Sequence, residues 1–215
     1  MRISKLTRSQ RVEGRILVHM ENGDLLRLSE NEVVAFGLYA GADLSEERLE
    51  ELRQAAKTAA VKGKALDLAA ARPMSKKELM DKLTARPRGR DREPLATAEQ
   101  AAMAVERLEE LGYLNDREYA KTLVRHYAAK GYGTYKIKDE LYRRGLPRED
   151  WEEALAQLKE SGDSAMEAFI EKKLRGSPNP DPKELKRLSD ALMRRGFSWS
   201  EVRDALRPYG GRDEE

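Results

Sequence analysis

The chain has 215 residues, with 41 Lys and Arg against 39 Asp and Glu, two His and no Cys. The lack of cysteine excludes a disulfide framework, a thiolate zinc site and a cysteine nucleophile. Charged residues make up 37% of the chain and aromatic residues 6%, which favours narrow buried stripes and an elongated shape. The longest apolar-looking run, residues 33–42, is too short to span a bilayer, and the N-terminus lacks the apolar region of a signal peptide. We therefore expect a soluble, cytoplasmic protein.

Charge is distributed in blocks of alternating sign, although the net charge is only +2. Residues 1–20 hold five basic residues and one acidic residue, a local charge of +4. Residues 121–148 hold eight basic and two acidic residues, and residues 172–207 hold ten basic and five acidic residues. Between these two basic blocks, residues 149–171 hold eight acidic residues and one basic residue. Such blocks indicate charged partners rather than a particular fold.

The first 43 residues predict a small αβ cap. An apolar, β-branched segment is followed by Asn22-Gly23, the pair that a two-residue type I′ turn prefers. Because a lone hairpin is marginal in water, we expect it to pack on a helix. The expected elements are a short strand at Ile3 and Leu6, strands over residues 15–20 and 25–28, and a helix over residues 32–38.

The sequence pattern after Leu44 predicts a helical structure. Ser45 is an N-cap followed by acidic residues, and an Ala-, Lys- and Leu-rich segment continues to Ala71, before Pro73 ends or redirects it. Further on, apolar residues three and four apart predict short helices. Their stripes are Ala101, Ala104, Val105 and Leu108; Ala120, Leu123, Val124 and Tyr127; and Trp151, Ala154, Leu155 and Leu158.

An internal repeat relates residues 139–155 to residues 190–206 at a constant offset of 51. Both copies contain an Arg-Arg-Gly-hydrophobic turn, at residues 143–146 and 194–197, and a fainter third copy starts at Asp81. The predicted fold is mainly α, with three tandem three-helix repeats and a small N-terminal β-hairpin cap, elongated and curved.

The predicted domains follow from this repeat. They are a cap at 1–43, a first helical repeat with a linker helix at 44–114, a second three-helix repeat at 115–160, a third at 161–210 and a disordered tail at 211–215. The first repeat contains a basic insertion at 86–94, with two Pro, one Gly and four Arg. This composition predicts an exposed, mobile loop.

The segment from Leu114 to Leu146 resembles the central repeat of the RecX family, regulators of the RecA recombinase. The residues that carry the resemblance are 112–120, Val124-Arg125, Lys130-Gly131-Tyr132-Gly133, Lys136-Ile137 and 140–146. Ser75–Leu79 resembles the start of the family's first repeat, and Leu192–Phe197 resembles its third-repeat signature. The first repeat departs from the family because it lacks the Gly-plus-hydrophobic ending and carries the insertion instead.

The resemblance implies a non-enzymatic modulator of RecA that acts as an inhibitor. It implies a chain that lies in the groove of the RecA–DNA filament, contacts more than one protomer, and suppresses strand exchange, ATP hydrolysis and filament growth. The expected partners are the RecA filament and single- or double-stranded DNA bound without sequence preference. We expect a monomer with no membrane association and no cofactor. The alternative is a free-standing, non-specific DNA-binding helical-repeat module.

The candidate partner-binding residues are basic side chains near the two Arg-Arg-Gly turns. They are Arg125, Lys130, Lys136, Lys138, Arg143, Arg144, Arg194 and Arg195. Two interpretations of the arginine pairs stay open. The arginines can bind a partner, or they can have a structural role, because Arg in a last helical turn complements the helix dipole. Gly145 and Gly196 are expected to take the left-handed conformation at C′, and Tyr142 is expected to pack partly into the repeat core. We find no motif for catalysis, metal binding or cofactor binding in the sequence.

Overall fold

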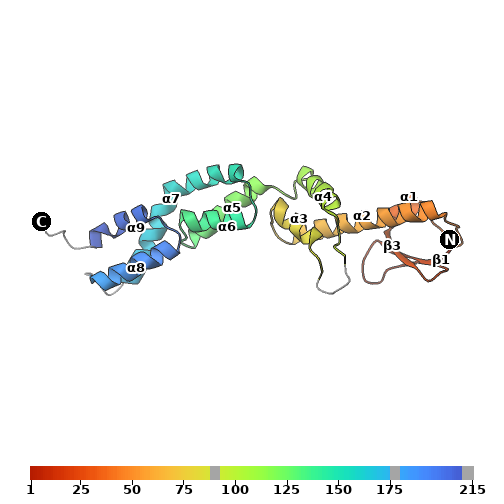
Figure 1. Cartoon of the computed structure of the whole chain (residues 1–215), viewed down its shortest axis with the longest axis horizontal. Coiled ribbons are helices and arrows are strands. Elements are labelled where there is room, and N and C mark those ends of the chain that lie inside the picture. The colour runs from red at the N-terminus through yellow and green to blue at the C-terminus, as the bar shows by residue number, and fades with distance from the viewer. Residues whose placement is uncertain (88–92, 175–179, 210–215) are drawn as a thin grey trace. The chain divides into compact units, whose positions relative to one another are not determined.

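The computed structural model describes residues 1–87, 93–174 and 180–209, and for residues 157–165 it describes the backbone only. The chain forms two compact units. Unit 1 comprises Met1–Arg72 and Leu79–Tyr113, and unit 2 comprises Pro73–Glu78 and Leu114–Glu215. Figure 1 shows their elements in chain order. The insertion's residues 88–92 and the predicted tail at 211–215 lie outside the described residues.

Unit 1 begins with a three-stranded antiparallel sheet in the order β1-β2-β3. Its strands are β1 (Ile3–Arg8), β2 (Arg15–Met20) and β3 (Leu25–Ser29), so the expected hairpin and third strand are confirmed. The turn differs from the prediction, because only Gly23 takes a positive φ, +91°. Met20 donates to the carbonyl of Asp24 at 2.9 Å, which makes a three-residue loop instead of a type I′ turn.

The first two helices of unit 1 pack on one face of this sheet (Figure 1). Helix α1 (Glu30–Ala35) starts with a capping box from Ser29, and α2 (Glu46–Ala71) is capped by Ser45 as expected. Inward residues of alternating strand positions, such as Val18 and Leu28, form a core with the start of α2. Two further helices follow, α3 (Lys76–Thr84), whose first three residues belong to unit 2, and α4 (Ala98–Glu110). The predicted stripe of α4 is buried.

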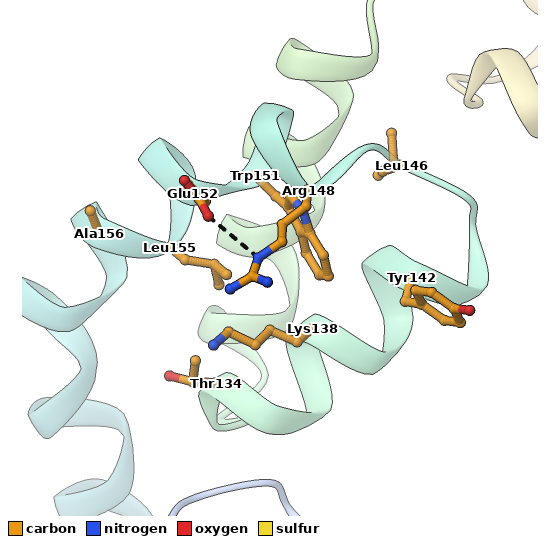
Figure 2. Close-up of a pocket in the computed structure, with 9 residues that line it drawn as sticks. All are labelled: Thr134, Lys138, Tyr142, Leu146, Arg148, Trp151, Glu152, Leu155 and Ala156. Atoms are coloured by element: carbon orange, nitrogen blue, oxygen red, sulfur yellow. Dashed lines mark ion pairs between the residues drawn. The ribbon is translucent and has the colours of Figure 1, made fainter.

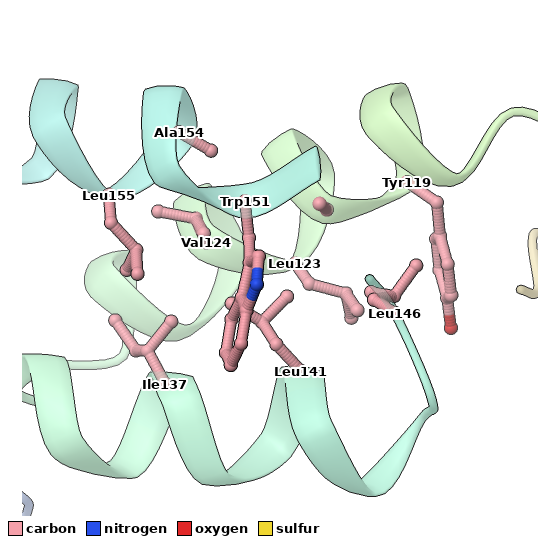
Figure 3. Close-up of a cluster of buried hydrophobic side chains, with 10 residues drawn as sticks. Tyr119, Leu123, Val124, Ile137, Leu141, Leu146, Trp151, Ala154 and Leu155 are labelled. Atoms are coloured by element: carbon pink, nitrogen blue, oxygen red, sulfur yellow. The ribbon is translucent and has the colours of Figure 1, made fainter. Parts of the chain in front are cut away.

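Unit 2 contains the two copies that the sequence repeat identified. The first copy has α5 (Asp116–Ala129), α6 (Thr134–Arg143) and the start of α7 (Arg148–Leu174). Figure 3 shows their shared core, in which Trp151 lies among Ile137, Leu141 and Leu155. The predicted stripe residue Leu158 lies among residues described by backbone only.

The second copy has α8 (Pro182–Arg194), α9 (Trp199–Leu206) and the short 3₁₀ turn η1 (Arg207–Tyr209). Met166 and Ile170 at the end of α7 pack with Leu192, Phe197 and Val202. Gly145 and Gly196 have φ of +67° and +87°, so both take the left-handed conformation as predicted.

The fold class is therefore mainly helical with a small N-terminal sheet, as the sequence predicts. Helix α2 has 26 residues, in line with the predicted long segment, whereas α7 has 27 residues and is longer than the short helix predicted there. Helix α7 runs through the predicted boundary at residue 160, and the domain boundaries stay a prediction. Among the described residues, no helix combines the length and the apolar character needed to cross a membrane.

Candidate functional site

Helix α6 separates a buried face from a basic face. Ile137, Glu140 and Leu141 are buried, whereas Lys136 and Lys138 are exposed. Two tyrosines also lie on the exposed side, Tyr135 at 64% and Tyr142 at 78% exposure. The expectation that Tyr142 packs into the core is wrong, because its position next to the buried Leu141 faces solvent. The exposed face of α6 is therefore basic and aromatic.

The second arginine of the first pair, Arg144, is a structural residue within unit 2. Its Nε donates to Glu140 Oε1 at 2.9 Å and its Nη1 donates to Tyr119 Oη at 2.6 Å. Nη1 also lies 3.4 Å from Glu78 Oε1, and the Arg144 carbonyl accepts from Ser75 Oγ at 2.6 Å. The end of α6 is thereby fixed to the start of α3. We call Arg144, Glu140, Glu78 and Tyr119 the Arg144 cluster.

The carboxylate of Glu140 is the most buried charge of this cluster, with 4% of its side chain exposed. Burial by itself raises the pKa of the Glu140 carboxyl. Hydrogen bonds from Tyr127 and Arg144 and the positive charges of Arg144 and Arg143 outweigh that effect, so the pKa lies below its ordinary value of 4.5. For Arg144, burial lowers the pKa, but the hydrogen bond to Glu140 and nearby negative charge raise it on balance. Both groups are therefore ionised at neutral pH.

The lowered pKa of Glu140 predicts acid-sensitive stability of unit 2. A carboxyl whose folded-state pKa is depressed contributes stability above its unfolded pKa, and that contribution is lost as pH falls through the folded value. We expect the difference in unfolding free energy between the wild type and Glu140→Gln to be constant near neutral pH and to shrink below pH 4.5. Urea unfolding at several pH values measures this difference. A difference that grows on acidification would contradict the assignment.

The second arginine of the later pair, Arg195, has an equivalent structural role. Its Nη1 donates to the carbonyls of Lys130 and Gly131, both at 3.1 Å. Its guanidinium lies over the Phe169 ring at 4.1 Å and the Tyr132 ring at 5.6 Å from their centroids. The end of α8 is thereby fixed to the loop between α5 and α6. Contacts within the fold therefore engage the guanidinium groups of both Arg144 and Arg195.

The first arginines of the pairs point to solvent. Arg143 is 71% exposed and pairs with Glu140, and Arg194 is exposed with no ion pair among the described residues. The other candidates are exposed as well. Lys136 lies 3.7 Å from Asp139, while no acidic group of the described chain pairs with Arg125, Lys130 or Lys138. Six of the eight candidate residues are thus accessible to a partner, and whether they bind one stays a prediction.

A groove between α6 and α7 adjoins the exposed face of α6 (Figure 2). Its volume is about 880 Å³. Trp151, Leu155 and Leu146 supply apolar wall, and Tyr142 stands at its rim. Lys138 and Arg148 add positive charge, and Arg148 pairs with Glu152 at 3.4 Å. We call this the α6–α7 groove. The groove combines an apolar wall with basic side chains. This combination suits an apolar side chain that has acidic neighbours.

Reasoning from the sequence missed two parts of this site. Glu140 lies on the apolar stripe of α6, four residues before Arg144, and a carboxylate in that position is the available signal of a buried ion pair. The sequence gives no comparable signal of the α6–α7 groove, because Trp151 and Leu155 have the spacing of ordinary core residues. Within the described parts of the chain, no group of His, Cys, Asp and Glu is arranged to hold a metal ion.

Comparison with known proteins agrees with the repeat organisation of unit 2. The family model of the RecX second three-helix domain matches residues 115–155, and that of the third three-helix domain matches residues 163–206. Two crystal structures have a similar fold. One, of regulatory protein RecX, covers 96% of this chain and 98% of its own at a TM-score of 0.68 and 21% identity. The other, of RecX from Lactobacillus salivarius, covers 71% and 96% at a TM-score of 0.59 and 19% identity.

Curated relatives are closer in sequence. The regulatory protein RecX of Pseudomonas fluorescens is 35% identical over 154 residues, which cover 72% of this chain and 92% of the relative. That of Pseudomonas savastanoi pv. phaseolicola is 33% identical and covers 72% and 94%. Identity at this level over nearly the full length of the relatives, together with the two matching domains, shows that the chain belongs to the RecX family of regulatory proteins.

Proposed function

We propose that this chain binds the RecA–DNA filament and suppresses its ATP hydrolysis, strand exchange and growth. The observation that carries the proposal is the α6–α7 groove, an apolar wall beside exposed cations on the repeat that matches the family's second domain. Such a surface suits an acidic protein partner, because apolar contacts supply affinity and charges supply orientation. In this proposal the chain acts as a cytoplasmic monomer without catalysis.

The exposed cations outside the groove support contact at several points. Arg125 lies on α5, Lys130 lies at the C-terminal end of α5, and Arg194 lies at the C-terminal end of α8. Weak contacts at separate points of one chain combine into tight binding. Arg143 and Arg194 stand at helix C-termini, where the partial negative charge of the dipole disfavours phosphate. This placement favours a protein partner over a DNA-binding module for these residues.

The test is ATP hydrolysis by preformed RecA filaments on single-stranded DNA, with this protein added well below one molecule per RecA protomer. We expect a progressive fall in rate. Lys138→Glu combined with Tyr142→Ala should raise the concentration for half-inhibition about tenfold, because truncating an interface anchor commonly costs at least that much. The double variant Lys57→Glu with Tyr39→Ala makes the same changes at exposed sites of unit 1 and should inhibit normally.

Two other results would contradict the proposal. Inhibition by the groove variant at the wild-type concentration would exclude the α6–α7 groove as the contact. An unchanged rate with wild-type protein, accompanied by tight binding to DNA alone, would favour the free-standing DNA-binding module.

A further inference from the structure

The sheet of unit 1 has a second face that its helices do not cover. The register pairs Lys5 with His19, Leu17 with Arg27 and Arg15 with Ser29. These residues alternate with the core positions Val18 and Leu28, so their side chains share the face opposite α1 and α2. Figure 1 shows both helices on one side of the strands. The other side is open and is mainly polar.

This open face is basic and hollowed. A depression of about 640 Å³ is lined by residues of all three strands and of the loop between β1 and β2. Five cations contribute to it and no acidic residue lines it. The cations are Lys5, Arg8, Arg11, Arg15 and Arg27, and we call this surface the basic sheet face. It accounts for most of the excess positive charge of the first 20 residues.

The charge of the basic sheet face is largely unneutralised. Arg8 pairs with the exposed Glu30 at 3.3 Å. Within the described parts of the chain, the side chains of the other four cations form no ion pair and no hydrogen bond. Two arginines elsewhere in unit 1 do form ion pairs, Arg53 with Asp24 at 3.2 Å and Arg107 with Glu110 at 2.8 Å. Exposed like charges without counter-charges repel one another weakly in water, and binding a polyanion relieves that repulsion.

We infer that the basic sheet face binds a nucleic-acid strand through its phosphates. Arginine presents a planar fork that fits phosphate oxygens, and three of the four unpaired cations are arginines. Thr7, Ser9 and Gln10 line the same depression and supply the neutral donors that commonly accompany such cations on phosphates.

The lining favours a nucleic acid over an acidic protein. Its apolar members are only Val12, Leu17 and Leu25, and it contains no Phe, Tyr or Trp. The cores of protein interfaces are enriched in aromatic residues, whereas binding to phosphates depends on charge and needs no apolar anchor. Contacts to phosphates carry no sequence information, so we expect little sequence preference.

The experiment is fluorescence anisotropy of a labelled thymidine oligonucleotide with the full chain, without RecA, over a range of salt concentrations. We compare the wild type with the triple variant Lys5→Gln, Arg15→Gln, Arg27→Gln. Each phosphate contact on a single strand contributes a slope of about −0.7 in log affinity against log salt, so the variant's slope should be about 2 less negative. A fourfold rise in salt should then cost the wild type about twentyfold more affinity than the variant.

Two matched variants keep this test specific. Lys57→Gln, Lys62→Gln, Lys64→Gln removes three exposed charges from α2 and should bind like the wild type. Arg15→Lys with Arg27→Lys keeps the charges and should keep the slope. Wild-type binding by the triple Gln variant would overturn the inference. The anisotropy measurement uses no RecA, so its result tests this inference independently of the proposed function.

Discussion

Replacing Arg144 with alanine is expected to destabilise unit 2 by about 3 kcal/mol, whereas Arg143→Ala should cost less than about 1 kcal/mol. The difference arises from what each guanidinium contacts. Arg144 is 25% exposed and bonds to Glu140, Tyr119 and Glu78, so its loss leaves a nearly buried carboxylate without its main partner. Arg143 is 71% exposed, and solvent replaces most of what it provides.

Tryptophan fluorescence during urea unfolding measures this difference, because both tryptophans of the chain, Trp151 and Trp199, lie in unit 2. Arg143→Ala is the matched control, one residue away and identical in chemistry. Equal costs for the two variants would contradict the structural role of Arg144. The comparison also decides how filament assays are designed. A variant that lacks both arginines mixes a loss of stability with a loss of contact, so Arg143 must be tested alone.

Local rules predicted the elements of this fold well. Helix α4 carries its stripe at three- and four-residue spacing, and all four stripe residues are buried. The capping serines Ser29 and Ser45 mark the starts of α1 and α2, although the sequence placed the first of these helices two residues late. The two Arg-Arg-Gly turns end helices with a left-handed glycine. Each of these features is set by residues a few positions apart, which sequence spacing makes visible.

The candidate site was predictable only in part, because its decisive contacts join distant residues. Arg144 meets Glu78 across 66 positions and Arg195 meets Lys130 across 65, and neither pairing can be read from spacing. The sequence therefore could not tell the structural arginine of each pair from the exposed one. Tyr142 shows the same limit, since a tyrosine beside a buried leucine can face either way. Whether the exposed cations bind RecA depends on a partner that the sequence of this chain does not contain.

The close approach of α6 and α8 explains why residue 133 is glycine. Gly133 is the N-cap of α6 and has no side chain to cap it. The carbonyls of Arg195 and Gly196 accept instead from the backbone N–H groups of Gly133 and Tyr135, both at 2.9 Å. The negative end of α8 thus meets the positive end of α6, which is favourable for both helix dipoles. By contrast, α8 itself starts with the side-chain cap of Asp181 and with Pro182 and needs no such carbonyl.

Gly133→Ala is therefore expected to separate the two repeats of unit 2. A Cβ at this position would lie 2.4 Å from both the Gly196 carbonyl oxygen and the Phe197 amide nitrogen, which are backbone atoms that cannot rotate away. Because φ of Gly133 is −80°, alanine adds no backbone strain, and the whole cost comes from this contact. We expect the free energy of unfolding of unit 2 to fall by about 2 kcal/mol and its Tm to fall by about 10 °C. Tryptophan fluorescence during thermal unfolding measures this change.

The control is Gly63→Ala in α2, where an added Cβ meets nothing within 4 Å. It should leave the tryptophan transition of unit 2 in place and stabilise α2 slightly, because alanine is the better helix former. An unchanged Tm for Gly133→Ala would show that the junction of α6 and α8 is looser than this geometry requires. A fall in Tm with filament inhibition reduced in parallel would show that a partner contacts both repeats at once. A fall in Tm with inhibition retained would place the contact on one repeat alone, and the α6–α7 groove is then the surface to test.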